Sequence, residues 1–165
     1  MSHAKQHGRS GTPATVAATK AKIDFTLHPY EPAPDAASYG EAAADALGVG
    51  HDRLFKTLVA EVDGDLTVAV VPVAATLDLK ALAAAVGGKR AQMADPQVAE
   101  RTTGYVVGGI SPLGQRRTLP TIIDTSVSGL ATVYVSAGRR GLQIELTPAD
   151  LVRLTGARTA AIARR

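Results

Sequence analysis

The sequence predicts an α+β or mixed α/β fold, in which a curled mixed β-sheet is surrounded by helices. Segments with the pattern of strands outnumber helical ones and are mixed irregularly with them along the chain. The chain has 165 residues, which is long enough for one ordinary domain to bury its own core without disulfides, and it contains no cysteine. We expect a flexible polar tail over residues 1–11 and a single globular domain over residues 12–165.

The first elements follow from caps and periodicity. A threonine followed by proline predicts a helix over residues 12–22, with the threonine as N-cap. Residues 25–28 alternate apolar and polar, which is typical of a half-buried strand, and a proline ends it. The proline-rich segment 30–38 is predicted to be a loop. An alanine-rich helix is expected over residues 39–47, closed by Gly48.

A β-hairpin is the clearest local prediction. Residues 54–62 and 66–73 are apolar-rich strands, and the pair Asp63-Gly64 between them suits a tight turn. Lys56 lies inside the first strand with apolar neighbours. Two interpretations are open: its stem covers apolar surface while the amine reaches water, or it places a cation at the mouth of a cleft.

Two further helices are predicted over residues 77–86 and 96–103. Three strands follow over residues 121–123, 131–136 and 142–146, and a last helix over residues 147–155. Thr76 or Asp78 caps the first of these helices, and Asp95 caps the second. A turn at residues 138–141 joins the last two strands. The mixture supports the predicted fold class.

Residues 104–114, Gly-Tyr-Val-Val-Gly-Gly-Ile-Ser-Pro-Leu-Gly, form the most unusual segment. The Gly108-Gly109 pair permits positive φ angles and a close approach of backbone to a ligand, while Pro112 restrains the bend. Taken alone, this pattern also fits an ordinary tight turn between strands. The segment lacks the lysine of a phosphate-binding P-loop, and no dinucleotide-binding fingerprint follows a predicted strand.

Composition excludes several kinds of chemistry. Without cysteine, and with four scattered histidines, the chain has no metal-ligand pattern, and we expect no metal and no cofactor. No apolar run has the length of a membrane span and no secretory signal is recognisable, so we expect a cytoplasmic protein that does not associate with membranes. The net charge of +3 includes four basic pairs, which suit either a nucleic-acid backbone or solubility alone.

Four strings in order closely resemble the YbaK-type bacterial Cys-tRNA(Pro) deacylases: Phe55-Lys56-Thr57-Leu58, Met93-Ala94-Asp95-Pro96, the segment 103–114, and Leu119-Pro120-Thr121-Ile122-Ile123-Asp124. The resemblance runs from Thr12 nearly to Arg165. It implies a YbaK-like editing-domain fold and trans-editing hydrolysis of cysteine mischarged onto proline tRNA. Cys-tRNA(Cys) is an open second substrate. Mischarged tRNA(Pro) is the implied partner, and the sequence leaves open whether prolyl-tRNA synthetase is a second one.

The resemblance also implies site residues. Lys56 matches the central lysine and Gly108 the first position of the G-x-x-x-P loop, and both are expected to be catalytic. The residues expected to bind substrate are Tyr30, Tyr39, Thr57, Gly109, Ile110, Ser111, Pro112, Ser136 and Gln143. Gln143 stands where the family is expected to have an acid, so it keeps a hydrogen-bonding carbonyl but loses the charge. Tyr39 replaces another aromatic and changes the polarity of the pocket more than its shape.

The chain offers no conventional nucleophile paired with a base. An aminoacyl ester is already activated, so positioning and donors for the oxyanion from the Gly108-Gly109 loop are the expected contributions. Lys56 is expected to bind the terminal adenosine or to orient the acyl group. The resemblance implies that the thiol of the substrate attacks its own ester. The alternatives are a deacylase for another small residue such as alanine, or a non-catalytic module that binds tRNA or a synthetase.

Overall fold

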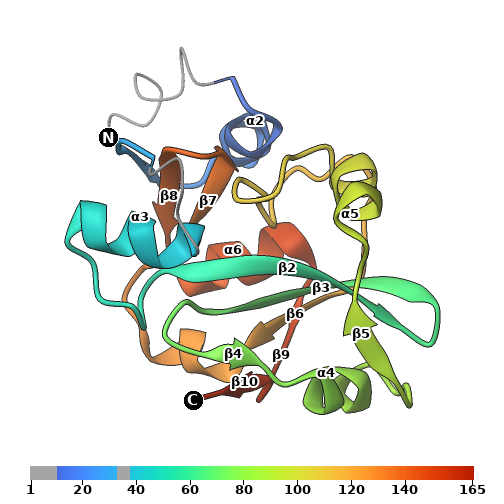
Figure 1. Ribbon diagram of the computed structural model, residues 1–165. Coiled ribbons are helices and arrows are strands. Elements are labelled where there is room, and N and C mark those ends of the chain that lie inside the picture. Colours follow the sequence, from blue (N-terminus) through green and yellow to red (C-terminus); the bar gives the residue numbers. More distant parts are fainter. Residues whose placement is uncertain (1–10, 33–37) are drawn as a thin grey trace.

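A long β-hairpin runs through the middle of the protein (Figure 1). The structure is a computed structural model that describes residues 11–32 and 38–165. Strands β2 (Phe55–Val62) and β3 (Asp65–Pro72) pair antiparallel along their whole length. Their turn has φ angles of 52° at Asp63 and 90° at Gly64, the positive values that a two-residue hairpin turn requires. The predicted hairpin is confirmed within one residue at each end.

The hairpin is the centre of a five-stranded mixed sheet in the order β5-β2-β3-β6-β9. The three outer strands are β5 (Ala91–Met93), β6 (Thr121–Asp124) and β9 (Arg158–Ala160). β5 pairs antiparallel with β2, whereas β3–β6 and β6–β9 are parallel pairs. The mixed fold class predicted from the sequence is therefore confirmed.

A second sheet stands at one end of the hairpin. It has the order β1-β8-β7, with β1 (Thr26–Pro29), β8 (Leu142–Leu146) and β7 (Val133–Arg139) all antiparallel. A parallel bridge between Leu54 and Tyr134 joins this sheet to the start of β2. β4 (Thr76–Leu77) and β10 (Ala163–Arg164) form a separate small pair. The two larger sheets therefore meet at the end of β2 that carries Lys56.

The helices surround these sheets (Figure 1): α2 (Pro13–Lys20), α3 (Tyr39–Leu47), α4 (Leu79–Ala85), α5 (Pro96–Thr103), the 3-10 helix η1 (Thr125–Gly129) and α6 (Pro148–Thr155). Each of the five α-helices begins at a side chain that accepts a backbone N–H bond: Thr12, Ser38, Asp78, Asp95 and Thr147. Of the two candidate caps of α4, Asp78 is therefore the one used. No helix in the described ranges is long and apolar enough to cross a membrane.

The structure differs from the predicted elements at helix and strand ends and in very short strands, where the local sequence signal is weak. The helix predicted over residues 77–86 begins at Leu79, because the two residues before its cap pair with β10 instead. The strand predicted over residues 131–136 extends to Arg139. The short strands β5, β9 and β10 were not predicted, since two or three residues are too few for a periodic signal. Most of the predicted tail and residues 33–37 of the predicted loop lie outside the described residues.

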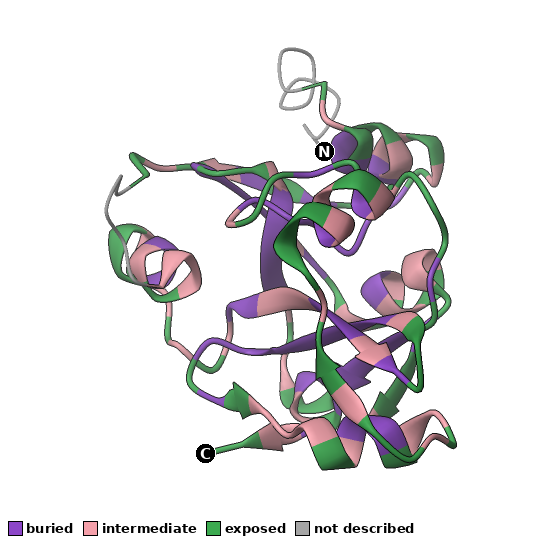
Figure 2. Cartoon of the chain, turned by 45° about the vertical axis from the view of Figure 1, so that its right-hand side comes forward, coloured by how far each residue is buried: buried purple, intermediate pink, exposed green. Residues whose placement is uncertain are grey.

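Buried residues are concentrated along the hairpin and its neighbours (Figure 2). From Thr67 to Pro72, β3 is buried on both faces. One apolar cluster includes Phe55 and Val59, and a second on the opposite face of β2 includes Ala60 and Val62. A strand that is packed on both faces has little freedom to move. The hairpin is accordingly a rigid platform for the side chains that β2 carries.

Asp124 ties the C-terminal segment to the sheet. Its side chain is buried, with 5% of the residue exposed, and one oxygen accepts the N–H groups of Ile162 and Ala163 at 2.9 Å each. The other oxygen accepts the N–H and the hydroxyl of Ser126 at 3.1 and 2.6 Å. Burial alone would raise the pKa of Asp124, but these hydrogen bonds together hold it below its usual value.

Candidate active site

A cavity of about 350 Å³ opens between the two larger sheets, the start of α3 and the segment 93–110. Its wall is mostly apolar. The lining residues are Ser38, Tyr39, Gly40, Leu54, Phe55, Lys56, Thr57, Leu58, Val59, Met93, Ala94, Pro96, Ala99, Val107, Gly108, Ile110, Ser136 and Gln143. A concave apolar site with a few polar groups is the common form of a small-ligand pocket.

The start of β2 supplies Lys56 and Thr57. Helix α3 approaches the hairpin closely at Gly40, where an added Cβ would lie 2.5 Å from Cγ1 of Val73, just after β3, and 3.8 Å from Cβ of Lys56 on β2. Because only glycine permits this approach, the helix places Tyr39 at the cavity wall beside Lys56. Lys56 and Thr57 are both half-buried, and they come from the rigid hairpin. Their backbone positions are therefore well defined.

Two buried side-chain atoms in the cavity wall have no hydrogen-bond partner in the described part of the chain. They are Oγ1 of Thr57 and Oε1 of Gln143, and Gln143 is only 4% exposed. A buried polar atom without a partner costs about 1–3 kcal/mol. Such atoms are usually explained by a strained functional site or by a ligand that completes their bonds. Gln143 offers an acceptor, and Thr57 offers a hydroxyl that accepts or donates.

Ser136 stabilises the glycine loop, residues 104–114, rather than serving as a free nucleophile. Its hydroxyl donates to the carbonyl oxygen of Gly109 at 3.0 Å and accepts the N–H of Gly138 at 3.1 Å. On the neighbouring strand, Gln143 is the direct partner of Ser136. The pair therefore forms the part of the wall that the second sheet contributes.

The glycine loop follows α5 directly, after Gly104 caps that helix with a φ of 84°. The N–H of Gly109 donates to the carbonyl of Val106 at 2.9 Å, so it is used within the loop. Gly108 has a φ of 89°, lines the cavity, and its N–H has no partner within residues 11–32 and 38–165. Of the two donors expected from the Gly108-Gly109 pair, only that of Gly108 is free to meet a ligand.

The structure brings together most of the predicted site. Tyr39, Lys56, Thr57, Gly108, Ile110, Ser136 and Gln143 all line the cavity. Four predicted residues do not: Tyr30, Gly109, Ser111 and Pro112. The N–H of Tyr30 donates to the carbonyl of Gly141, and its side chain packs against the apolar cluster beneath α3. Ser111 and Pro112 are buried behind the loop, where the Ser111 hydroxyl accepts the N–H of Leu113 at 3.1 Å.

Much of the apolar wall was not named from the sequence. It includes Phe55, Val59, Met93, Ala94, Pro96 and Ala99. The string Met93-Ala94-Asp95-Pro96 contributed to the family resemblance, and that resemblance was the only signal that pointed to three of these residues. Phe55 and Val59 share one face of β2 with Thr57, since alternate residues of a strand point to the same side. That periodicity was an available signal for Phe55 and Val59.

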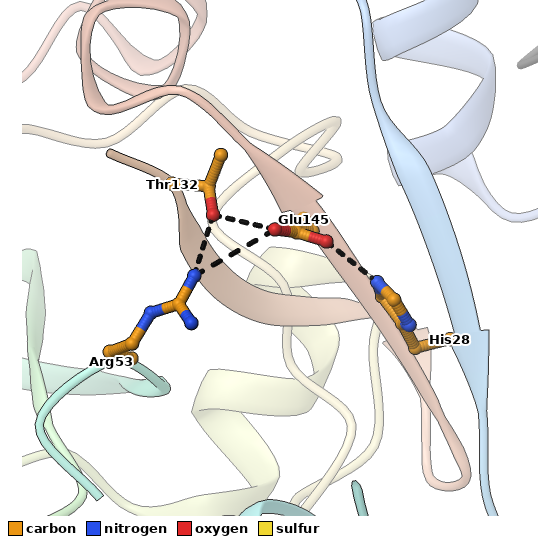
Figure 3. Close-up of polar contacts among 4 residues, drawn as sticks. All are labelled: His28, Arg53, Thr132 and Glu145. Carbon is orange, nitrogen blue, oxygen red and sulfur yellow. Dashed lines mark hydrogen bonds and ion pairs between the residues drawn. The ribbon is translucent and has the colours of Figure 1, made fainter. Parts of the chain in front are cut away.

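A polar network supports the second sheet beside the cavity (Figure 3). One oxygen of Glu145 lies 2.8 Å from Nε2 of His28, and the other accepts the hydroxyl of Thr132 at 2.6 Å. Nη2 of Arg53 donates to Thr132 at 2.8 Å and lies 3.8 Å from Glu145. Glu145 follows Gln143 by two residues and therefore lies on the same face of β8. The network links the strand that carries Gln143 to the residues just before β2.

The pKa of Glu145 reflects this network. Burial by itself would raise it, but the hydrogen bonds from Thr132 and His28, with the charge of His28, together lower it below the ordinary value. The carboxylate is therefore ionised at neutral pH and held by three side chains. Among the described residues, no group of three or more His, Cys, Asp or Glu side chains is arranged to hold a metal ion.

Comparison with known proteins identifies close relatives. The family model described as the aminoacyl-tRNA editing domain matches residues 33–154. A protein of Enterococcus faecalis, named as a proposed Cys-tRNA(Pro)/Cys-tRNA(Cys) deacylase, EbsC, is 42% identical over 125 residues, which cover 74% of this chain and 75% of the relative. The multifunctional Ser/Thr-tRNA deacylase ProXp-y of Escherichia coli is 28% identical over 136 residues, 79% of each chain.

The fold agrees with solved structures. A crystal structure described as a proposed trans-editing enzyme for prolyl-tRNA synthetase superposes with a TM-score of 0.78 at 24% identity, covering 93% of this chain and 96% of that one. This likeness confirms the predicted YbaK-like fold. The names of the sequence relatives confirm the predicted enzyme class, that of an aminoacyl-tRNA deacylase.

Proposed function

Because this chain belongs to the aminoacyl-tRNA editing domain family, we propose that it removes cysteine from mischarged tRNA(Pro) and uses the thiol of the substrate as the nucleophile. The observation that carries this proposal is the composition of the cavity wall. Among the described residues that line it, there is no carboxylate, imidazole or thiol. A wall without a carboxylate, imidazole or thiol to act as general base or nucleophile favours a substrate that brings its own nucleophile.

The polar groups of the wall suit an aminoacyl group. Oε1 of Gln143 is an unpaired acceptor for the α-ammonium group, and the hydroxyl of Thr57 is an unpaired group for the ester or the amine. The free N–H of Gly108 is the donor for the oxyanion that develops on the carbonyl oxygen of the ester. Lys56 supplies the cation of the wall, which suits the ribose or phosphate oxygens of the terminal adenosine.

The proposed step is an intramolecular acyl transfer. The sulfur of cysteine attacks the ester carbon, the bond to the ribose oxygen breaks, and that oxygen takes a proton to balance the one lost by the thiol. The product is a cysteine thiolactone, which water then opens to free cysteine. Effective molarities for well-placed intramolecular groups reach about 10⁵ M or more, so holding the substrate in this geometry accounts for several kcal/mol of the barrier.

A matched panel of Cys-, Ser- and Ala-tRNA(Pro), each incubated with purified protein, tests this proposal. We expect rapid deacylation of the cysteine substrate and detection of its thiolactone in acid-quenched samples. Serine has nearly the same size, but its hydroxyl is almost never ionised at neutral pH, so its tRNA should bind and resist cleavage. Comparable rates on all three substrates, without thiolactone, would contradict the proposed mechanism.

A second candidate keeps the hydrolysis and changes the substrate. The relative named as a Ser/Thr-tRNA deacylase shares 28% identity, and neither of its named substrates carries a thiol. In that case a water molecule in the cavity attacks the ester, and Gln143 in place of an acid marks a change in how the amine is held. The same panel separates the two candidates, because only the second predicts turnover of Ser-tRNA(Pro). Co-purification with prolyl-tRNA synthetase tests that enzyme as a partner.

A further inference from the structure

Arg140 contacts the two parts of the cavity mouth that flank Gly108. It lies in the turn between β7 and β8, and both Nε and Nη2 of its guanidinium donate to the carbonyl oxygen of Val107, at 2.9 and 2.6 Å. The same group stacks on the ring of Tyr39, with Cζ 4.4 Å from the ring centroid. Arg140 therefore connects the glycine loop to the first residue of α3.

The bond to Val107 determines the direction of the free donor. The peptide unit is planar and trans, so the carbonyl of Val107 and the N–H of Gly108 belong to one rigid plane and point in opposite directions. Holding the carbonyl toward Arg140 points the N–H away from it. Rotation of this peptide would replace the donor by a carbonyl oxygen, which would repel an oxyanion.

The space around Gly108 has no room for a side chain. Its φ is 89°, and an added Cβ would lie 2.7 Å from Nε of Arg140 and 2.8 Å from Cδ2 of Tyr39. A side chain at this position would thus meet Arg140 and Tyr39, the two side chains that clamp this peptide. Positive φ together with this close packing explains why the position requires glycine.

We propose that Arg140 is a positioning residue that fixes the peptide between Val107 and Gly108, so that the N–H of Gly108 is held toward the oxyanion of the substrate. This inference rests on the proposed function for its catalytic consequence, but the clamp itself is a property of the free protein. Two hydrogen bonds to one carbonyl also polarise the amide and strengthen its N–H as a donor.

A lysine cannot reproduce this geometry. The guanidinium forms two bonds that converge from one plane on the carbonyl oxygen of Val107, and it stacks on an aromatic face with that plane, whereas an ammonium is a compact point charge. If the role of Arg140 were only to attract the tRNA backbone, lysine would serve nearly as well, and the neighbouring Arg139 would contribute similarly. The pair Arg139-Arg140 therefore provides its own control.

The kinetic test compares Arg140→Lys with Arg139→Gln, using whichever aminoacyl-tRNA the wild-type protein cleaves fastest. We expect Arg140→Lys to lower kcat by about 10- to 100-fold with little change in KM, because loss of an oxyanion donor outright costs about 100-fold or more. Arg139→Gln should change KM and its salt dependence while kcat stays within about twofold. A lysine variant with wild-type kcat, or equal losses in both variants, would overturn the proposal.

Amide exchange supplies a readout that does not depend on activity. The N–H of Gly109, bonded to the carbonyl of Val106 inside the loop, reports how well the loop is held. In Arg140→Lys we expect this amide to exchange about tenfold faster, with the melting temperature nearly unchanged. Unchanged exchange would overturn the clamp. A wild-type protein that cleaves no substrate of the panel would overturn the proposed function instead, and the exchange result would still decide the clamp.

Discussion

Replacing Thr57 by valine should make the protein more stable and less active. The two side chains have nearly the same shape, and valine is well suited to a strand. The hydroxyl of Thr57 is buried, and among the described residues it has no hydrogen-bond partner, so the folded protein bears its desolvation cost without compensation. An orphaned buried group costs about 1–3 kcal/mol. For a chain of this size, a gain of 1 kcal/mol raises the melting temperature by roughly 2–4 °C.

The loss of activity follows from the same atom. A hydrogen bond between the Thr57 hydroxyl and the substrate is worth about 0.5–1.5 kcal/mol, which corresponds to a decrease in kcat/KM of about 2- to 10-fold. Calorimetric melting and deacylation rates measured on one preparation give both quantities. The opposite signs are the distinctive feature of this prediction, since an ordinary core substitution lowers stability and activity together.

Thr15→Val is the matched control. Thr15 is also buried, but its hydroxyl donates to the carbonyl of Thr12 at 3.0 Å and lies in α2, away from the cavity wall. Valine there removes a satisfied hydrogen bond, so it should lower stability by about 1 kcal/mol and leave kcat/KM unchanged. If Thr57→Val melts below the wild type, as the control does, the hydroxyl is satisfied in the free protein and the reasoning is refuted.

Further variants test other parts of the molecule. Asp124→Asn should lower stability by about 3 kcal/mol, roughly 10 °C in melting temperature, because an amide cannot accept the four bonds that this carboxylate accepts; an unchanged melting temperature would contradict that role. The lowered pKa of Glu145 means that its charge stabilises the fold above the ordinary glutamate pKa and that this contribution is lost as the pH falls through the lowered value. Glu145→Gln should therefore have a free energy of unfolding about 1 kcal/mol below that of the wild type at pH 7, and the difference should disappear as the pH falls through the lowered pKa; a constant difference would count against the network. Lys56→Ala should retain the melting temperature and lose about 100-fold in kcat/KM, whereas a surface lysine would show no loss.

The sequence predicted the elements that depend on local signals. Caps such as Thr12 and Asp95, and the Asp63-Gly64 turn, depend on a few adjacent residues, and the structure has them where they were expected. The strands β9 and β10 gain their hydrogen bonds from partners distant in the chain, with Asp124 holding the segment between them. No local pattern encodes that arrangement.

Sequence reasoning predicted those site residues that match a position of the family motif. Lys56 and Gly108 were named from the family resemblance, and both line the cavity. The contribution of Arg140 was not predictable, because a basic pair in a turn fits phosphate binding and solubility equally well. Its contacts with Val107 and Tyr39 join three segments that lie far apart in the sequence. Only their arrangement in space distinguishes a clamp from a surface charge.

The pH dependence of the rate on Cys-tRNA(Pro), relative to Ser-tRNA(Pro) and corrected for spontaneous hydrolysis, tests the central claim most directly. A thiol nucleophile predicts a cysteine rate that rises with pH until the substrate thiol ionises, near its ordinary pKa of about 8.5. It also predicts a preference for cysteine over serine of about 100-fold or more at neutral pH, because the serine hydroxyl supplies almost no anion. Equal rates for the two substrates, with the same dependence on pH, would show that water rather than the substrate thiol attacks the ester.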